Sequence, residues 1–130
     1  MSDDERRPGA VEPTSIRDIL HAMNEAGRFQ ATVLAAMDGL LIATVPSDYD
    51  TDAAAAMVAL LQKVSNDAQS LLGMAEVDEV TIRDRKRIRL VCRYVVTGED
   101  ELVLAVIVPP GRCYRRVTNR AIRQIRRLLA

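Results

Sequence analysis

The apolar positions of the chain fall into blocks whose spacing alternates between that of a helix and that of a strand. The first block recurs every third or fourth residue, begins after Thr14 or Ser15, either of which can cap a helix, and ends near Gly27, which predicts a short helix. Two apolar runs over 31–37 and 40–45 are typical of strands. A long Ala-rich block over 51–72 returns to helical spacing, so a second helix is expected there.

The second half of the chain contains three strand-like runs and one more helical block. Residues 77–83 and 88–96 alternate between apolar and polar side chains, as half-buried strands do. Residues 102–108 are apolar on both faces, which predicts a central strand covered on both sides. A last helix is expected over 113–129. The prediction is therefore an α+β domain with its elements in the order α-β-β-α-β-β-β-α.

The first two strands are separated by Asp38 and Gly39, a pair that favours a β-hairpin when it lies between apolar runs. The predicted turn is type I′, in which both central residues adopt positive φ, as Gly does freely and Asp tolerates. Asp50 or Thr51 can accept hydrogen bonds from the first free N–H groups of the long helix, and Gly73 suits the left-handed residue after its end.

Helical geometry divides the long helix into two dissimilar sides. One side is apolar and is expected to lie on the sheet; it carries Ala53, Met57, Leu60, Leu61, Val64, Ala68, Leu71 and Leu72. The opposite side is small and nearly uncharged, whereas a solvated side usually carries Glu, Lys and Arg. We interpret it as a contact surface for a partner, with a merely neutral solvent face as the alternative. Its central residues are Ala55, Ala59, Gln62 and Asn66.

The length of 130 residues and the apolar content of 48% are ordinary for one domain with one core. Residues 1–13 are charged and contain Pro and Gly, so we expect a flexible acidic tail followed by one domain over 14–130. No apolar run approaches the ~20 residues that a membrane span needs, and no signal-peptide core follows the N-terminus. A cytoplasmic location is expected.

Charge is balanced over the whole chain but unevenly distributed along it. From Thr81 onward there are 13 Arg or Lys residues against 4 Asp or Glu, out of 18 of each sign in total. On the last helix, four arginines recur at helical spacing and form one stripe: Arg116, Arg120, Arg123 and Arg127. The stripe is a solvated face, a docking surface for an acidic partner, or a contact for nucleic acid or anionic membrane. The aromatic content of 3% and the lack of groove-reading motifs argue against nucleic acid.

The sequence offers no residue pattern for catalysis or for holding a metal or cofactor. It contains no phosphate-binding loop, nucleophile elbow, His-rich pattern or dinucleotide fingerprint. Cys92 and Cys113 fit no metal-ligand spacing, and Cys92 is interpreted as a small buried strand residue. We therefore expect no enzyme activity, cofactor or metal.

Three segments make the chain similar to the Roadblock family of dynein light chains and bacterial GTPase regulators. They are the hairpin Val-Leu-Ala-Ala-Met-Asp-Gly-Leu-Leu-Ile-Ala over 33–43, the Ala-rich helix from Asp52, and the strand over 102–108 with its following helix. The resemblance extends over about 15–129 and implies a five-stranded antiparallel sheet. It places the middle helix on one face of the sheet and the terminal helices on the other. The chain departs from the family in residues 109–112 and in its many arginines on the last helix.

The resemblance also implies how the protein associates. Family members pair as dimers through the middle helix and the following edge strand, which corresponds to 77–83 here and carries Val80 and Ile82. Bacterial members commonly bind or regulate Ras-like small GTPases. The leading hypothesis is a homodimeric scaffold that binds such a GTPase and is a candidate GTPase-activating protein. The alternatives are a purely structural adaptor, or a protein whose basic helix contacts nucleic acid or anionic membrane.

Overall fold

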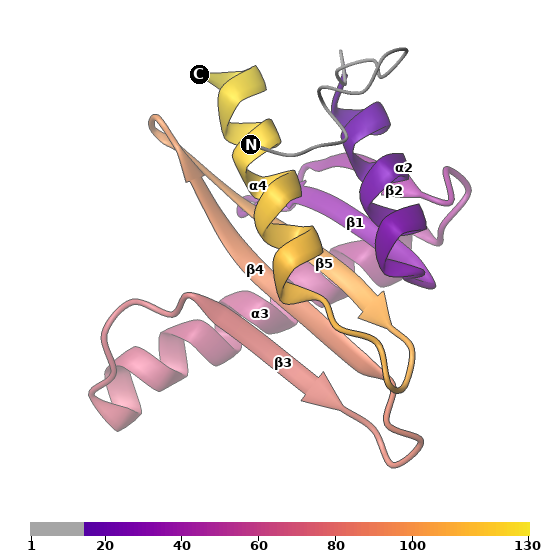
Figure 1. Cartoon of the computed structure of the whole chain (residues 1–130). Coiled ribbons are helices and arrows are strands. Elements are labelled where there is room, and N and C mark those ends of the chain that lie inside the picture. The colour runs from indigo at the N-terminus through magenta and orange to yellow at the C-terminus, as the bar shows by residue number, and fades with distance from the viewer. Residues whose placement is uncertain (1–14) are drawn as a thin grey trace.

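A computed structural model describes residues 15–130 and shows one sheet with helices on both of its faces (Figure 1). The predicted element order and fold class are confirmed, while the expected tail over 1–13 lies outside the described residues. The elements are α2 (Ile16–Gly27), β1 (Ala31–Ala36), β2 (Leu41–Val45), α3 (Thr51–Leu72), β3 (Glu79–Arg83), β4 (Arg89–Thr97), β5 (Asp100–Val108) and α4 (Arg115–Leu129).

The sheet has five strands in the order β2-β1-β5-β4-β3, and all neighbouring strands are antiparallel. The predicted central strand is confirmed, because β5 lies between β1 and β4 and buries nearly all its residues from Leu102 onward. Within the described part of the chain, β2 and β3 form the two edges of the sheet.

Each face of the sheet has its own apolar core, because successive side chains of a strand point to opposite faces. On one face, Leu104 of β5 packs with residues of α2 and α4, including Leu20 and Ile125. On the other face, Val103 packs with Val58 and other residues of α3. The middle helix therefore lies on one face and the terminal helices on the other, as expected (Figure 1).

Helices α2 and α3 begin and end where the sequence predicts. Ser15 caps α2 by accepting a hydrogen bond from the Asp18 N–H at 3.1 Å, and Gly73 at φ 68° ends α3. The left-handed residue after α2 is Arg28, at φ 54°. Gly27 instead meets a packing need, because a Cβ there would lie 2.3 Å from the Phe29 ring. Asp50 caps α3 as predicted.

The turn between β1 and β2 is not type I′, so this prediction was wrong. Gly39 has φ 100°, but Asp38 is not among the residues with positive φ. The Gly39 N–H donates to the Ala36 carbonyl at 2.9 Å, and the Asp38 carboxylate accepts from the Leu40 N–H at 2.9 Å. A three-residue loop of this kind needs one left-handed residue only, and the pairing register shifts between Leu34 and Ala35 to accommodate it.

The side of α3 that lies on the sheet also differs from the prediction. The buried residues are Ala54, Val58, Leu61 and Ser65, so only Leu61 of the expected large residues is buried. The apolar sector of the helix is wider than its contact with the sheet, and the sheet covers the part where small Ala54 and Ser65 allow close approach. The last turns of α3 extend beyond the strands, which exposes Leu71 and Leu72 (Figure 1).

Candidate interaction surfaces

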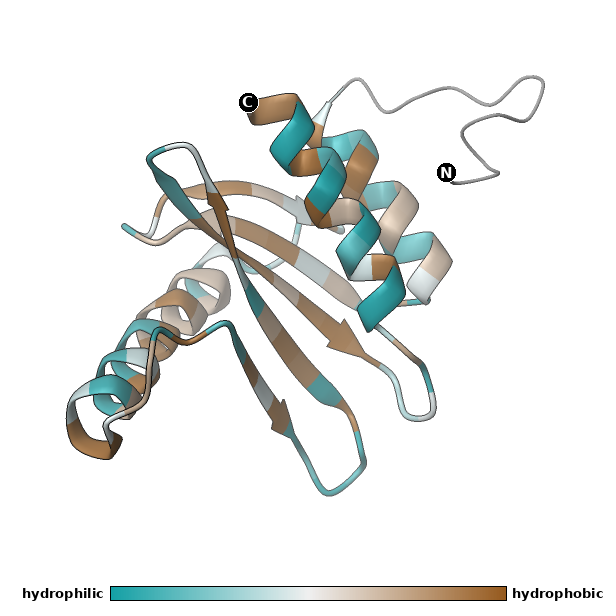
Figure 2. Cartoon of the chain, turned by 60° about the vertical axis from the view of Figure 1, so that its left-hand side comes forward, coloured by the Kyte–Doolittle hydropathy of each residue, from teal (hydrophilic) through white to brown (hydrophobic). Residues whose placement is uncertain are grey.

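A group of exposed apolar side chains lies on α3, in the segment just after it and on β3. We call it the α3 patch, and its six members are between 38% and 76% exposed; they account for six of the eleven large apolar side chains exposed in residues 15–130. Figure 2 shows apolar residues on α3 where this helix projects from the sheet. Such a concentration marks an interaction surface more often than chance exposure does. The members are Leu60, Val64, Leu71, Leu72, Met74 and Ile82.

The two flanks of α3 face opposite ends of the sheet. On one flank, the Gln62 side chain donates to the Met37 carbonyl, in the turn between β1 and β2. The Met37 N–H donates to the Glu101 carbonyl at 3.0 Å, so this flank faces the end where β4 turns into β5. Leu60 and Val64 project from the other flank, because they lie roughly 160° around the helix from Gln62. They therefore face the end of the sheet that carries Ile82.

The predicted α3 contact residues Ala55, Ala59, Gln62 and Asn66 are all exposed and lie on the Gln62 flank. Val80 is half-buried against the α3-side core, and Ile82 is exposed on the same face of β3. The structure thus brings four predicted residues together on one flank and two on the edge strand. It adds the Leu60 flank, which sequence analysis had assigned to the sheet.

A cluster of polar side chains on the opposite face of the sheet joins β3 to the start of α4. The Glu79 carboxylate accepts a hydrogen bond from the Tyr114 hydroxyl at 2.7 Å and lies 3.4 Å from Arg115 and 3.8 Å from Arg93. Arg93 also donates to Thr118 of α4 at 2.9 Å. The hydrogen bond to Glu79, with a smaller effect of burial, raises the pKa of Tyr114. The sequence does not reveal this cluster, because its members are far apart in the chain.

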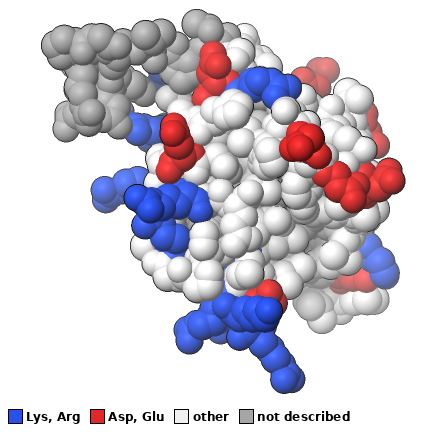
Figure 3. Space-filling model, turned by 90° about the vertical axis from the view of Figure 1, so that its right-hand side faces the viewer, with Lys and Arg blue, Asp and Glu red and all other residues white. Residues whose placement is uncertain are grey.

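The arginine stripe lies on the side of α4 that the buried residues leave uncovered. Arg116, Arg123 and Arg127 are exposed and Arg120 is half-buried, whereas Ile122 and the other buried residues face the sheet. A second group of basic side chains surrounds the turn between β3 and β4, over 84–87, at the lower end of the molecule (Figure 3). Both groups can attract an anionic surface.

The structure adds little that favours catalysis. Burial, with a smaller effect of Glu79, raises the pKa of the Cys92 thiol to about 12, so the reactive thiolate is disfavoured there. Cys113 is exposed. Within residues 15–130, no three His, Cys, Asp or Glu side chains are grouped so that they could hold a metal ion. No helix in this part of the chain has the length and apolar composition needed to cross a membrane.

No protein-family model matches the sequence, and no curated protein matches it. Several solved structures do match this chain. MglB of Myxococcus xanthus is 18% identical with a TM-score of 0.74, over 91% of this chain and 97% of that chain. An MglB with a tetrameric arrangement is 19% identical with a TM-score of 0.66, over 92% and 97%. A Roadblock/LC7 domain from Streptomyces avermitilis is 16% identical with a TM-score of 0.57, over 85% and 88%. This chain therefore has the fold of a Roadblock-type domain.

Proposed function

We propose that this protein is a homodimeric scaffold that binds a Ras-like small GTPase and regulates its nucleotide cycle. The α3 patch is the observation that carries self-association, because it includes Ile82 of β3, an edge strand whose outer side borders no other strand among residues 15–130. The Roadblock-type fold and the family resemblance support the choice of a GTPase as partner.

Covering the α3 patch would favour dimerisation and offset part of the free-energy cost of association. Fully burying one Leu side chain contributes about 1.5–3 kcal/mol, and Leu60, Leu71 and Leu72 are all exposed. Either flank of α3 can meet the same helix of a second copy. The Gln62 flank offers small residues for close backbone approach, and the Leu60 flank offers apolar area. We place the dimer contact on the Leu60 flank, with Val80 and Ile82 of β3, and retain the Ala59 side as the competing arrangement.

The GTPase supplies its own active site, so the scaffold acts by favouring one arrangement of the partner's mobile loops. The arginine stripe is the proposed docking surface, since its charge can attract an acidic partner and speed association. Under this proposal the chain itself is not an enzyme, and stimulation of GTP hydrolysis is one form its regulation can take.

Binding to purified Ras-like GTPases tests this function. Each GTPase is loaded with GDP or with a non-hydrolysable GTP analogue and titrated with the scaffold. We expect one GTPase to bind about tenfold tighter in one nucleotide state than in the other. Equal affinity for both states would support a structural adaptor. No binding below about 100 μM, with tight and steeply salt-dependent binding to DNA or anionic vesicles, would support the basic-helix alternative.

A further inference from the structure

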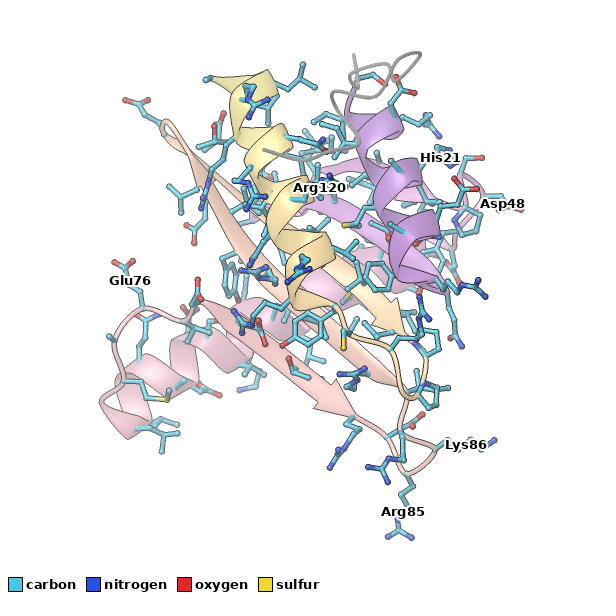
Figure 4. All side chains as sticks on the ribbon, in the orientation of Figure 1. His21, Asp48, Glu76, Arg85, Lys86 and Arg120 are labelled. Carbon is cyan, nitrogen blue, oxygen red and sulfur yellow. The ribbon has the colours of Figure 1, made fainter. Side chains whose placement is uncertain are left out.

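The end of β3 and the turn that follows it carry four exposed cations. We call them the basic turn; they are Arg83, Arg85, Lys86 and Arg87. None of these side chains forms a hydrogen bond or an ion pair with another residue of 15–130. Figure 4 shows Arg85 and Lys86 pointing away from the body of the domain. The charges of the basic turn therefore do not hold the described part of the chain together.

Hydrogen bonds to the backbone fix the conformation of the basic turn. The Asp84 carboxylate accepts from the N–H groups of Lys86 and Ile88, both at 2.9 Å. The Arg87 N–H donates to the Asp84 carbonyl at 3.0 Å. Arg87 has φ 69°, in the left-handed region that Gly and Asn occupy more readily. A cation thus stands where another residue would be less strained, which indicates that its charge has a use outside the fold.

The loop between β5 and α4 adds positive charge beside the basic turn. Arg89, the first residue of β4, donates to the Arg112 carbonyl and lies over the Tyr114 ring, 5.7 Å from its centroid. These contacts hold the loop next to the turn. Together, residues 83–89 and 109–116 contain eight Arg or Lys against one Asp. Charges more than about 10 Å away are largely screened at ~0.1 M salt, so this local excess, and not the net charge of +0, decides what this end attracts.

The composition of this end fits an anionic lipid surface better than a protein or a nucleic acid. No large apolar side chain is exposed in residues 83–89 or 109–116. Protein interfaces, in contrast, have apolar or aromatic anchors at their centre and are depleted in Lys. Tyr114 is the one aromatic residue of these two segments. It is half-buried, with the guanidinium groups of Arg89 and Arg115 over its ring, so it offers no free face for stacking on a base.

We propose that the basic turn, together with residues 109–116, binds the surface of an anionic membrane. Its shape favours this partner, because a projecting turn can contact only a few of the phosphates that are fixed along a duplex, whereas anionic lipids diffuse in the membrane and gather around the cations. Clusters of about 4–8 Lys or Arg bind such membranes. The contact is peripheral and reversible, since it has no exposed apolar part. The inference goes beyond the proposed function and does not depend on a GTPase.

Flotation of the full chain with lipid vesicles tests this proposal. The vesicles contain phosphatidylcholine alone, or phosphatidylcholine with about 30% phosphatidylserine to supply the negative charge. We expect binding to the anionic vesicles only, weakened at least about tenfold between roughly 50 and 500 mM salt. Each basic side chain near such a surface strengthens binding about fivefold. The double variant Arg85→Gln/Lys86→Gln should therefore bind about twentyfold more weakly than the wild type.

The matched control is Arg123→Gln/Arg127→Gln, which removes the same charge from the arginine stripe on α4. It should weaken vesicle binding less than about twofold, because these side chains lie outside the proposed contact. Equal losses in the two double variants would show that positive charge acts without regard to place, and would overturn the role of the basic turn. Thermal melts show that both variants are folded; the side chains of Arg85 and Lys86 make no contact whose loss would lower the melting temperature.

Three further results would overturn the proposal. The first is a wild type that stays unbound to the anionic vesicles at low salt. The second is tighter binding to a short labelled DNA duplex than to the vesicles, lost in Arg85→Gln/Lys86→Gln, which would identify nucleic acid as the partner. The third is unchanged vesicle binding by this variant with slower association with a Ras-like GTPase, which would identify a protein partner. The vesicle measurements contain no GTPase, so the proposed function is tested separately from this inference.

Discussion

Helices α3 and α4 bury the same number of residues but differ in what they leave exposed. Each has four buried residues; α3 packs on one face of the sheet, and α4 packs together with α2 on the other. The exposed flank of α3 carries Leu60 and Val64, whereas the exposed side of α4 carries arginines such as Arg116 and Arg123. Packing within the chain therefore does not account for the difference between these exposed sides.

The difference points to two kinds of association. Removing apolar area from water lowers the free energy, and salt does not weaken this effect. The α3 patch therefore suits a lasting contact. Exposed arginines contribute little affinity each and are screened by salt, so the stripe on α4 suits fast and reversible docking. One domain can thus hold a second copy on one face and bind a changing partner on the other.

The largest expected effect is loss of the dimer when a charge enters the exposed flank of α3. Val64→Arg should raise the dimer dissociation constant about a hundredfold or more, because it removes apolar contact and buries an unpaired cation. Ala59→Arg is the matched variant on the other flank and should weaken the dimer less. Sedimentation of both variants beside the wild type, expected at twice the chain mass, measures the difference. A larger loss with Ala59→Arg would move the interface to the flank that sequence analysis chose.

A smaller effect is expected at the turn that the Gln62 flank of α3 contacts. Gly39→Val should lower the free energy of unfolding by about 1–3 kcal/mol, because a β-branched residue resists the φ of 100°. The space beside Gly39 is open, so the cost is conformational and not steric. Gly39→Asn, which tolerates a left-handed conformation, should cost less than half as much in thermal melts. Equal melting temperatures for the wild type and both variants would contradict the positive φ of Gly39.

The two cysteines differ in their access to solvent, since Cys92 is buried and Cys113 is exposed. A thiol reagent should label Cys113 rapidly and Cys92 only on unfolding, giving one reactive thiol per native chain. Burial raises the pKa of Cys92 from about 9 to about 12, so the unfolded chain releases this proton first. The contribution of Cys92 to the free energy of unfolding should therefore be constant below about pH 9 and fall above it, by up to about 1.4 kcal/mol per pH unit. Cys92→Ala should remove this contribution to the pH dependence of the free energy of unfolding, measured by urea titrations at several pH values.

The smallest effect on stability is expected from the arginine stripe. Replacing Arg116, Arg120, Arg123 and Arg127 with Gln should change the free energy of unfolding by less than about 1 kcal/mol in total, because three of the four side chains are exposed and exposed charges contribute little. Association with the GTPase should slow, and its rate should lose most of its salt dependence. Stopped-flow measurements at several salt concentrations give both the association rate and its salt dependence. An unchanged rate at every salt concentration would assign the stripe to solvent alone.

Local motifs and the periodicity of apolar residues predicted most of the fold. The caps at Ser15 and Asp50 and the stop at Gly73 each depend on a few neighbouring residues, and all three are found as predicted. The apolar run over 102–108 identified the central strand because burial on both faces removes alternation. These features are legible in sequence because the interactions behind them act over short stretches of chain.

Tertiary structure alone decided the rest. The sheet covers only part of the apolar sector of α3, and which part depends on how the helix crosses the strands. The pair Asp38-Gly39 is equally compatible with type I′, and the turn found instead comes with a register shift between β1 and β2 and a hydrogen bond from the Met37 N–H to a carbonyl of β5. Glu79 and Tyr114 lie 35 residues apart in the chain, and only the pairing of β3 with β4 and the packing of α4 bring them into contact. Periodicity shows which side chains avoid water, but the fold determines which neighbours cover them.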